Sequence, residues 1–382
     1  MARIVVFGAA GYTGRLTVEA LTAAGQRPVL AGRGRERLAA LADQHGGLEA
    51  AVADATDPAS VRALVEPGDV LVSTVGPFTR YGEPAVAAAA GMGVHYVDST
   101  GEAPFIRRVF AEFGPKAERS GAALLTAFGY DFVPGNLAGG LAIQDARNAA
   151  GGAADGAADG AGAVPRRVEI GYFLTGDTSA SGMSSGTRAT IATGPGQRQH
   201  VWRDGRLVTE PIARRVRRFA DDGRQLPAVS FGGSEQLALP RWAPQLREVD
   251  VYLGWFGRRS RALQLASLLE PVALALPGAR RRLQQRGERA LGRTGQGPDA
   301  AARARTGALV IAVARDAAGR ELARVRLAGG NGYDLTGQLL AFAATRLAAG
   351  EVNGAGALGP VDAFGLEVLE AACRDAGLRR TA

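Results

Sequence analysis

The sequence is poor in the residues that build disulfides and metal centres. Its 382 residues include a single cysteine, Cys373, and only three histidines, at positions 45, 95 and 200. One cysteine excludes an internal disulfide and a cysteine-ligated metal centre, and it fits a reducing compartment. The three histidines stand in unrelated contexts, which argues against a histidine-based centre. We therefore expect no metal site.

Long apolar runs and nucleic-acid-binding patterns are also missing. No apolar stretch reaches the roughly 18 residues of a membrane span, and no signal peptide precedes the first apolar segment, so we expect a cytoplasmic protein. Lys116 is the only lysine, so arginine carries nearly all of the positive charge behind the net charge of +8. No basic segment interleaves with stacking aromatics, which argues against nucleic-acid binding. A basic surface would instead attract phosphorylated cofactors, carrier proteins or acidic lipid.

The most informative feature that is present is a glycine turn near the N-terminus. The apolar residues 4–7 are followed by Gly8, Gly11 and Gly14, and a helical pattern begins near Arg15. Strand, glycine turn and helix in this order are typical of a dinucleotide-binding unit, although an ordinary strand-to-helix turn is the alternative. We expect Gly8 to allow a tight turn, Gly11 to let the backbone approach a pyrophosphate, and Gly14 to let helix and strand pack. The pyrophosphate would bind at the helix N-terminus.

The end of the second expected strand distinguishes NADP from NAD. Residues 27–33 end in Arg33, at the point where NAD-binding proteins place an acidic residue for the ribose 2′-hydroxyl. Arg35 and Arg37 follow closely, and guanidinium groups suit a 2′-phosphate. We therefore predict NADP(H) as the cofactor, with Arg33 as the 2′-phosphate ligand. The alternative for Arg35 and Arg37 is that they belong to a solvated helix face.

Strand and helix patterns alternate over residues 1–145. Further apolar strand patterns lie at residues 48–53, 70–75, 94–97 and 123–127. The alternation predicts an α/β fold with a doubly wound parallel Rossmann sheet, in which the loops after the strands face one site. Hairpin signals in the second half of the chain predict an inserted α+β domain with a mixed or antiparallel sheet.

These patterns predict two domains. We expect a Rossmann domain over residues 1–135, completed by C-terminal helices over 333–382, and an α+β substrate domain over 136–332. The low-complexity residues 149–163 should form a flexible loop of the second domain. Residues 262–276 should form a helix with an apolar face, which packs on its own domain or serves as a lid or membrane-surface contact.

Several motifs extend beyond the glycine turn. They are Val75-Gly76-Pro77-Phe78, His95–Asp98 with Gly101-Glu102, Gly129–Pro134, Ser185-Gly186-Thr187 and Gly332-Tyr333. Together with the glycine turn they resemble the saccharopine dehydrogenase-like oxidoreductases, and in particular the branch of trans-acting enoyl reductases. The resemblance implies a pyridine nucleotide bound at Gly8, Ala10, Gly11, Tyr12, Thr13, Gly14, Arg33, Asp54, Val75, Gly76 and Pro77. Independently, an acid such as Asp54 after the third strand could accept a hydrogen bond from adenine, or it could cap the segment near Asp57.

The loop after the sixth strand supplies the candidate catalytic residues, Tyr130 and Asp131. Hydride transfer needs a proton donor beside the nicotinamide, and a tyrosine can donate a proton or hold a carbonyl oxygen. The alternatives are that Tyr130 serves packing and that Asp131 caps the helix beginning near Val133. No Ser-His-Asp arrangement supports hydrolase chemistry.

The leading hypothesis is an NADPH-dependent reductase of a C=C bond conjugated to a carbonyl, which the resemblance favours as an enoyl-type lipid or polyketide substrate. One alternative is an imine reductase or amino-acid dehydrogenase, for which Arg188 could hold a carboxylate. Another is a non-catalytic NADP(H)-binding sensor. The expected partner is a small-molecule substrate, lipophilic or carrier-bound. A homodimer and a peripheral membrane contact stay open.

Overall fold

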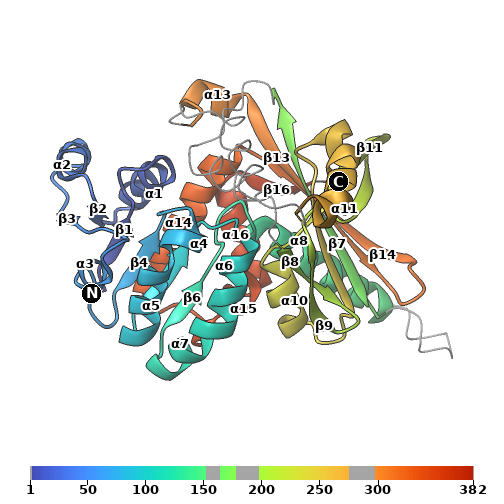
Figure 1. Ribbon diagram of the computed structural model, residues 1–382, viewed down its shortest axis with the longest axis horizontal. Coiled ribbons are helices and arrows are strands. Elements are labelled where there is room, and N and C mark those ends of the chain that lie inside the picture. The colour runs from blue at the N-terminus through green and yellow to red at the C-terminus, as the bar shows by residue number, and fades with distance from the viewer. Residues whose placement is uncertain (1, 152–163, 178–197, 275–296, 382) are drawn as a thin grey trace. The chain divides into compact units, whose positions relative to one another are not determined.

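The computed structural model describes residues 2–151, 164–177, 198–274 and 297–381 (Figure 1). The chain divides into two compact units, Met1–Val133 with Asn331–Gly377, and Pro134–Gly330 with Leu378–Ala382. Residues 152–163 of the expected flexible loop, and the segment that contains Arg188, lie outside the described residues. No helix in the described ranges has the length and apolar character needed to cross a membrane.

The first unit contains a seven-stranded sheet in which every neighbouring pair is parallel. In spatial order its strands are β15 (Gly356–Ala357), β6 (Ala123–Leu125), β5 (His95–Asp98), β4 (Val70–Ser73), β1 (Ile4–Phe7), β2 (Val29–Gly32) and β3 (Ala50–Val52). The sequence of strands reverses between β1 and β4, and ligands bind at such a switch point, beyond the carboxyl ends of the strands. The predicted doubly wound parallel sheet is confirmed.

Helices cover both faces of this sheet because its central strands are apolar on both sides. All four residues of β1 and of β4 are buried, as expected for a doubly covered sheet. Val5 and Phe7 pack in one core cluster with residues of the helix α5 (Glu83–Met92), whereas Val6 alternates to the opposite face.

The first unit contains ten further helices among its described residues. They are α1 (Tyr12–Ala23), α2 (Arg35–Gln44), α3 (Pro58–Arg62), α4 (Phe78–Tyr81), α6 (Ala103–Arg108), the π-helix η1 (Val109–Phe113), α7 (Gly114–Ser120), α14 (Gly332–Ala348), α15 (Pro360–Phe364) and α16 (Leu366–Asp375).

The second unit contains a nine-stranded mixed sheet. Its main path runs β10 (Val216–Asp221), β11 (Arg224–Phe231), β12 (Glu248–Leu253), β7 (Arg167–Gly176), β13 (Thr306–Arg315), β14 (Glu321–Gly329) and β16 (Leu378–Thr381), and β8 (Arg198–Arg203) with β9 (Arg206–Pro211) joins at β12. Among the described strands of this sheet, only β12 and β7 pair in parallel. Its helices are α8 (Val133–Gly151), α10 (Glu235–Trp242), η2 (Gly257–Arg259), α11 (Ser260–Leu274) and α13 (Ala300–Ala304). The expected α+β unit with a mixed sheet is confirmed.

The end of the chain differs from the sequence-based assignment. We expected residues 333–382 to complete the first domain, but residues 378–382 group with the second unit. The reason is β16, whose backbone pairs antiparallel with β14, from Arg326↔Thr381 to Gly329↔Leu378. Helices α14 to α16 lie in the first unit, as their sequence position suggested.

Two buried carboxylates hold the second sheet together through arginines. Asp250 of β12 and Glu169 of β7 are register partners, and both side chains are almost entirely buried. Asp250 contacts Arg203 at 2.8 Å, Arg215 at 2.9 Å and Arg167 at 3.0 Å. Part of the arginine excess therefore neutralises buried acids inside the second unit, where charge pairing is required to offset desolvation.

Candidate functional site

The glycine turn after β1 leaves no room for side chains at two of its three glycines. Gly8 has a φ of +92°, and a Cβ on it would lie 2.6 Å from the hydroxyl oxygen of Thr74. A Cβ on Gly14 would lie 2.2 Å from the carbonyl oxygen of Gly8. Gly8 therefore makes the tight turn, and Gly14 allows α1 to approach β1 closely, as in dinucleotide-binding turns.

Gly11 presents an open helix N-terminus. It is exposed and is the residue that precedes α1, and no side chain caps the helix. The first turn of α1 contains no acidic residue. Unpaired N–H groups and the helix dipole favour an anion at such a position. The exposed and uncapped start of α1 thus fits the pyrophosphate of a dinucleotide.

The loops after β2 and β3 bring Arg33 and Asp54 near each other. Arg33 is exposed, and it contributes to lowering the pKa of Asp54. The larger cause of that lowered pKa is Thr56, whose backbone N–H and hydroxyl both donate to Asp54 at 2.8 Å. The capping role considered for Asp54 belongs to Asp57, which accepts from the Ala59 N–H at the start of α3.

The loop after β4 is held by a buried carboxylate from the loop after β5. Glu102 accepts hydrogen bonds from the N–H groups of Phe78 at 2.7 Å and Thr79 at 3.0 Å, and from the Thr79 hydroxyl at 2.6 Å. These bonds fix Phe78 and Thr79, which directly follow Val75, Gly76 and Pro77. The peptide bond between Gly76 and Pro77 is cis. Gly101-Glu102 stands out in the sequence as part of a motif, but the pattern does not predict this role for Glu102.

The buried Asp98 joins the ends of β5 and β6. Its Oδ1 accepts from the N–H of Thr100 and of Ala127, each at 2.9 Å, and its backbone carbonyl accepts from Phe128 at 2.8 Å. Burial raises the pKa of Asp98 to about 6. Asp98 therefore anchors the loop that carries Tyr130 and Asp131, a positioning role that sequence reasoning missed.

Tyr130 is held against the start of α14. Its side chain is only 5 % exposed, and its backbone N–H donates to the hydroxyl of Thr336 at 3.0 Å. A Cβ on Gly332 would lie 2.9 Å from the ring, so the tyrosine ring packs directly on that glycine. These contacts favour the packing interpretation, and a catalytic role for Tyr130 stays a prediction.

Asp131 has the environment of a neutral carboxyl group. Its Oδ1 is buried and has no hydrogen-bond partner among the described residues, and its Oδ2 lies beside Gly101. Burial raises the pKa of Asp131 to about 7. The Val133 N–H at the start of α8 bonds to the Gly129 carbonyl, and no hydrogen bond among the described residues makes Asp131 a cap. A carboxyl group whose pKa lies near 7 is suited to proton transfer at neutral pH.

Helix α14 packs along α1, and its first residue, Gly332, lies against the Tyr130 ring. Tyr12, the first residue of α1, meets Tyr333 edge to face, with ring centroids 5.0 Å apart. Gly337 allows the two helices to approach, since a Cβ there would lie 3.0 Å from Leu16. The start of α14 therefore contacts both candidate regions, through Gly332 at the Tyr130 loop and through Tyr333 at the glycine turn.

Comparison with known proteins places the first unit in a sequence family. The profile of the saccharopine dehydrogenase NADP binding domain matches residues 4–125. A protein of Mycobacterium tuberculosis (strain H37Rv) whose name describes it as a trans-acting enoyl reductase is 32% identical over 376 residues, covering 88% of this chain and 86% of its own. The trans-acting enoyl reductase of Mycobacterium leprae is 41% identical over 140 residues, or 35% of this chain and 34% of its own.

Two solved structures share the fold over the full length of the chain. Saccharopine dehydrogenase (L-Glu forming) from Saccharomyces cerevisiae superposes with a TM-score of 0.60 at 14% identity, covering 100% of this chain and 99% of its own. The homospermidine synthase of Legionella pneumophila, solved in complex with NAD, gives a TM-score of 0.59 at 9% identity, covering 100% of this chain and 91% of its own. At such low identity these likenesses establish the fold alone.

Proposed function

The chain belongs to the saccharopine dehydrogenase-like family of NADP-binding oxidoreductases, and from this premise we propose that it reduces a C=C bond conjugated to a carbonyl group with NADPH. The chain is an NAD(P)-dependent oxidoreductase, and its named relatives support a reductase. The observation that carries the finer proposal is Asp131, a carboxyl group with a pKa of about 7 in the loop after β6 of the dinucleotide-binding sheet.

Different residues of the first unit would bind different parts of the cofactor. Residues 8–14, with Ala10, Tyr12 and Thr13 between the glycines, would receive the pyrophosphate at the start of α1. Arg33 would hold the 2′-phosphate, and Asp54 would accept from the adenine amino group. Residues 75–77 would line the nicotinamide side, where Glu102 keeps their loop in place through Phe78 and Thr79.

The proposed chemistry separates hydride and proton transfer. When bound, NADPH supplies a hydride to the β carbon of the conjugated double bond. Asp131 supplies the proton to the α carbon, so that the C=C bond becomes a saturated C–C bond and the carboxyl group becomes a carboxylate, which water reprotonates. Tyr130 is the second candidate donor or the holder of the carbonyl oxygen, through its hydroxyl group.

The substrate would be an acyl compound, lipophilic or carrier-bound. A carrier protein is compatible with the net charge of +8, because carriers with acidic surfaces are attracted by a basic one. An imine or amino-acid substrate is the alternative, and screening both substrate classes for NADPH oxidation separates the two.

Arg33→Ala should weaken NADPH binding by about tenfold or more, because a charge-assisted contact to phosphate is worth about 1.5–3 kcal/mol. NADH binding should change little, since NADH has no 2′-phosphate. Titration followed by nicotinamide fluorescence measures both affinities. Arg119→Ala, at an exposed position of α7, is the matched control and should leave both affinities unchanged. Equal losses for NADPH and NADH in Arg33→Ala would remove the 2′-phosphate role.

A further inference from the structure

Helix α11 is attached to its unit through polar groups. The Gln264 side chain donates to the backbone carbonyl of Arg214 at 3.2 Å, and the Ser267 hydroxyl donates to that of Ile212 at 2.6 Å. Ser267 is buried. The side of the helix that meets the segment at 212–214 is therefore its polar side, the reverse of an amphipathic helix packed on its own core.

The opposite side of α11 exposes a row of leucines. Leu265 is 61% exposed, Leu268 is 40% exposed and Leu269 is 65% exposed. Together with Arg261 they occupy positions i, i+4, i+7 and i+8, which lie on one stripe of an α-helix. The sequence left open whether this apolar face packs on its own domain, and for these three leucines the structure contradicts that interpretation.

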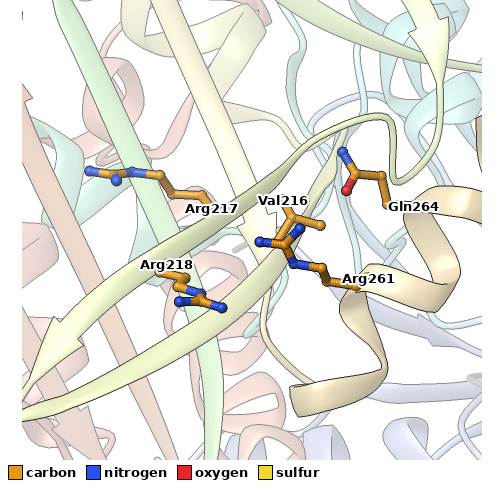
Figure 2. A pocket seen from close by; sticks show the side chains of 5 residues that line it. All are labelled: Val216, Arg217, Arg218, Arg261 and Gln264. Carbon is orange, nitrogen blue, oxygen red and sulfur yellow. The ribbon is translucent and has the colours of Figure 1, made fainter.

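A basic hollow adjoins this stripe. It has a volume of about 430 Å³, and Figure 2 shows its lining by Val216, Arg217, Arg218, Arg261 and Gln264, from β10 and α11. Arg217 is already occupied, because it pairs with the buried Glu169 at 3.1 Å. Arg218 and Arg261 are exposed, and neither has an ion pair or hydrogen bond in the described part of the chain. Two guanidinium groups thus remain for an external anion.

We propose that α11 and this hollow form a docking surface for a membrane that contains anionic phospholipid. Arg218 and Arg261 would bind lipid phosphate groups, which guanidinium forks fit well. Leu265, Leu268 and Leu269 would enter the boundary between headgroups and acyl chains, as the apolar face of an interfacial helix does. The combination of adjacent, unneutralised arginines with a projecting leucine row distinguishes this surface from a purely ionic one. This proposal does not depend on the reaction proposed above.

Vesicle flotation of the full chain tests the proposal. The chain should float with vesicles of phosphatidylcholine mixed with phosphatidylglycerol, and much less with vesicles of phosphatidylcholine alone. The triple variant L265Q/L268Q/L269Q and the double variant R218Q/R261Q should each lose at least about tenfold in affinity for the mixed vesicles. The variant R206Q/R224Q removes the same charge at two exposed arginines outside the hollow and is the matched control, with affinity close to that of the unaltered chain.

The circular dichroism spectrum of each variant serves as the check of folding, since every substituted residue belongs to the second unit, whereas the proposed NADPH site belongs to the first. Equal flotation of the control and the R218Q/R261Q variant would overturn the role of the hollow. The unaltered chain could instead fail to float but bind the acidic polymer poly-L-glutamate tightly, with R218Q/R261Q abolishing that binding. This result would exclude a membrane as the partner and assign the surface to an acidic protein. A chain that binds neither probe would refute the docking surface.

Discussion

Asp131→Asn should lower kcat by about 100- to 10,000-fold, the range that a positioned proton donor contributes, while leaving NADPH affinity nearly unchanged. Asparagine keeps the size and polarity of the side chain, so the loop after β6 should keep its anchor at Asp98. What asparagine removes is the transferable proton of a buried carboxyl group. Steady-state kinetics with NADPH oxidation, together with a fluorescence titration of the cofactor, separates the effects on turnover and binding.

The pH dependence of kcat gives the same assignment a second readout. The proton donor must be protonated, so turnover should fall as pH rises through about 7, the raised pKa of Asp131. In Asp131→Asn the residual activity should lack this alkaline decline. Asp43→Asn, at an exposed position of α2, is the control and should keep both the rate and the profile. A full rate for Asp131→Asn would exclude Asp131 as donor and leave Tyr130 as the candidate to be tested by substitution with phenylalanine.

Asp250→Asn should reduce the free energy of unfolding by about 3 kcal/mol, because removing one member of a buried charge cluster leaves its partners uncompensated. Asp250 is fully buried and contacts Arg167, Arg203 and Arg215. Burial works to lower the pKa of Arg167 and Arg215, but Asp250 and the neighbouring acids outweigh it and raise both pKa values, as expected for a favourable interaction between the carboxylate and these guanidinium groups.

Urea denaturation followed by circular dichroism measures the loss in Asp250→Asn. Asp222→Asn is the matched control, because Asp222 is exposed and its nearest guanidinium, that of Arg326, is 3.7 Å away. Exposed pairs of this kind contribute about 0–1 kcal/mol. Similar midpoints for the two variants would mean that the arginine cluster does not stabilise the second sheet.

The parallel sheet was predictable because its strands carry their own signal. Strands β1 and β4 are short and buried on both faces, and all of their residues except Ser73 are apolar. The turn at Gly8, Gly11 and Gly14 also carries a local signal, since the positive φ of Gly8 and the close contact of Gly14 with the Gly8 carbonyl arise within the turn itself.

The strands of residues 198–231 could not be predicted from local pattern. Their arginines interrupt the apolar alternation, and they fit a sheet only because acids far away in sequence neutralise them, as Glu169 does for Arg217. The orientation of α11 could not be predicted from the sequence either, because it depends on contacts with distant residues. Periodicity identifies an amphipathic helix, but the contacts of Gln264 and Ser267 decide which side faces the sheet.

The supporting residues of the candidate site were hidden because their partners are distant in sequence. Asp98 positions the loop after β6 by accepting a hydrogen bond from Ala127, and Glu102 positions the loop after β4 by accepting one from Phe78. The sequence nominated Tyr130 and Asp131 together. Their different burial and hydrogen bonding, which only the fold supplies, favour Asp131 as the donor.

Titration of the purified chain with NADPH and NADH, followed by nicotinamide fluorescence, tests whether the glycine turn is an NADP(H) site. We expect saturable binding of NADPH and distinctly weaker binding of NADH, because the open start of α1 receives the pyrophosphate of both, and Arg33 recognises only the 2′-phosphate. If neither nucleotide bound, the glycine turn would not be a cofactor site, and the proposed reductase would have no source of hydride.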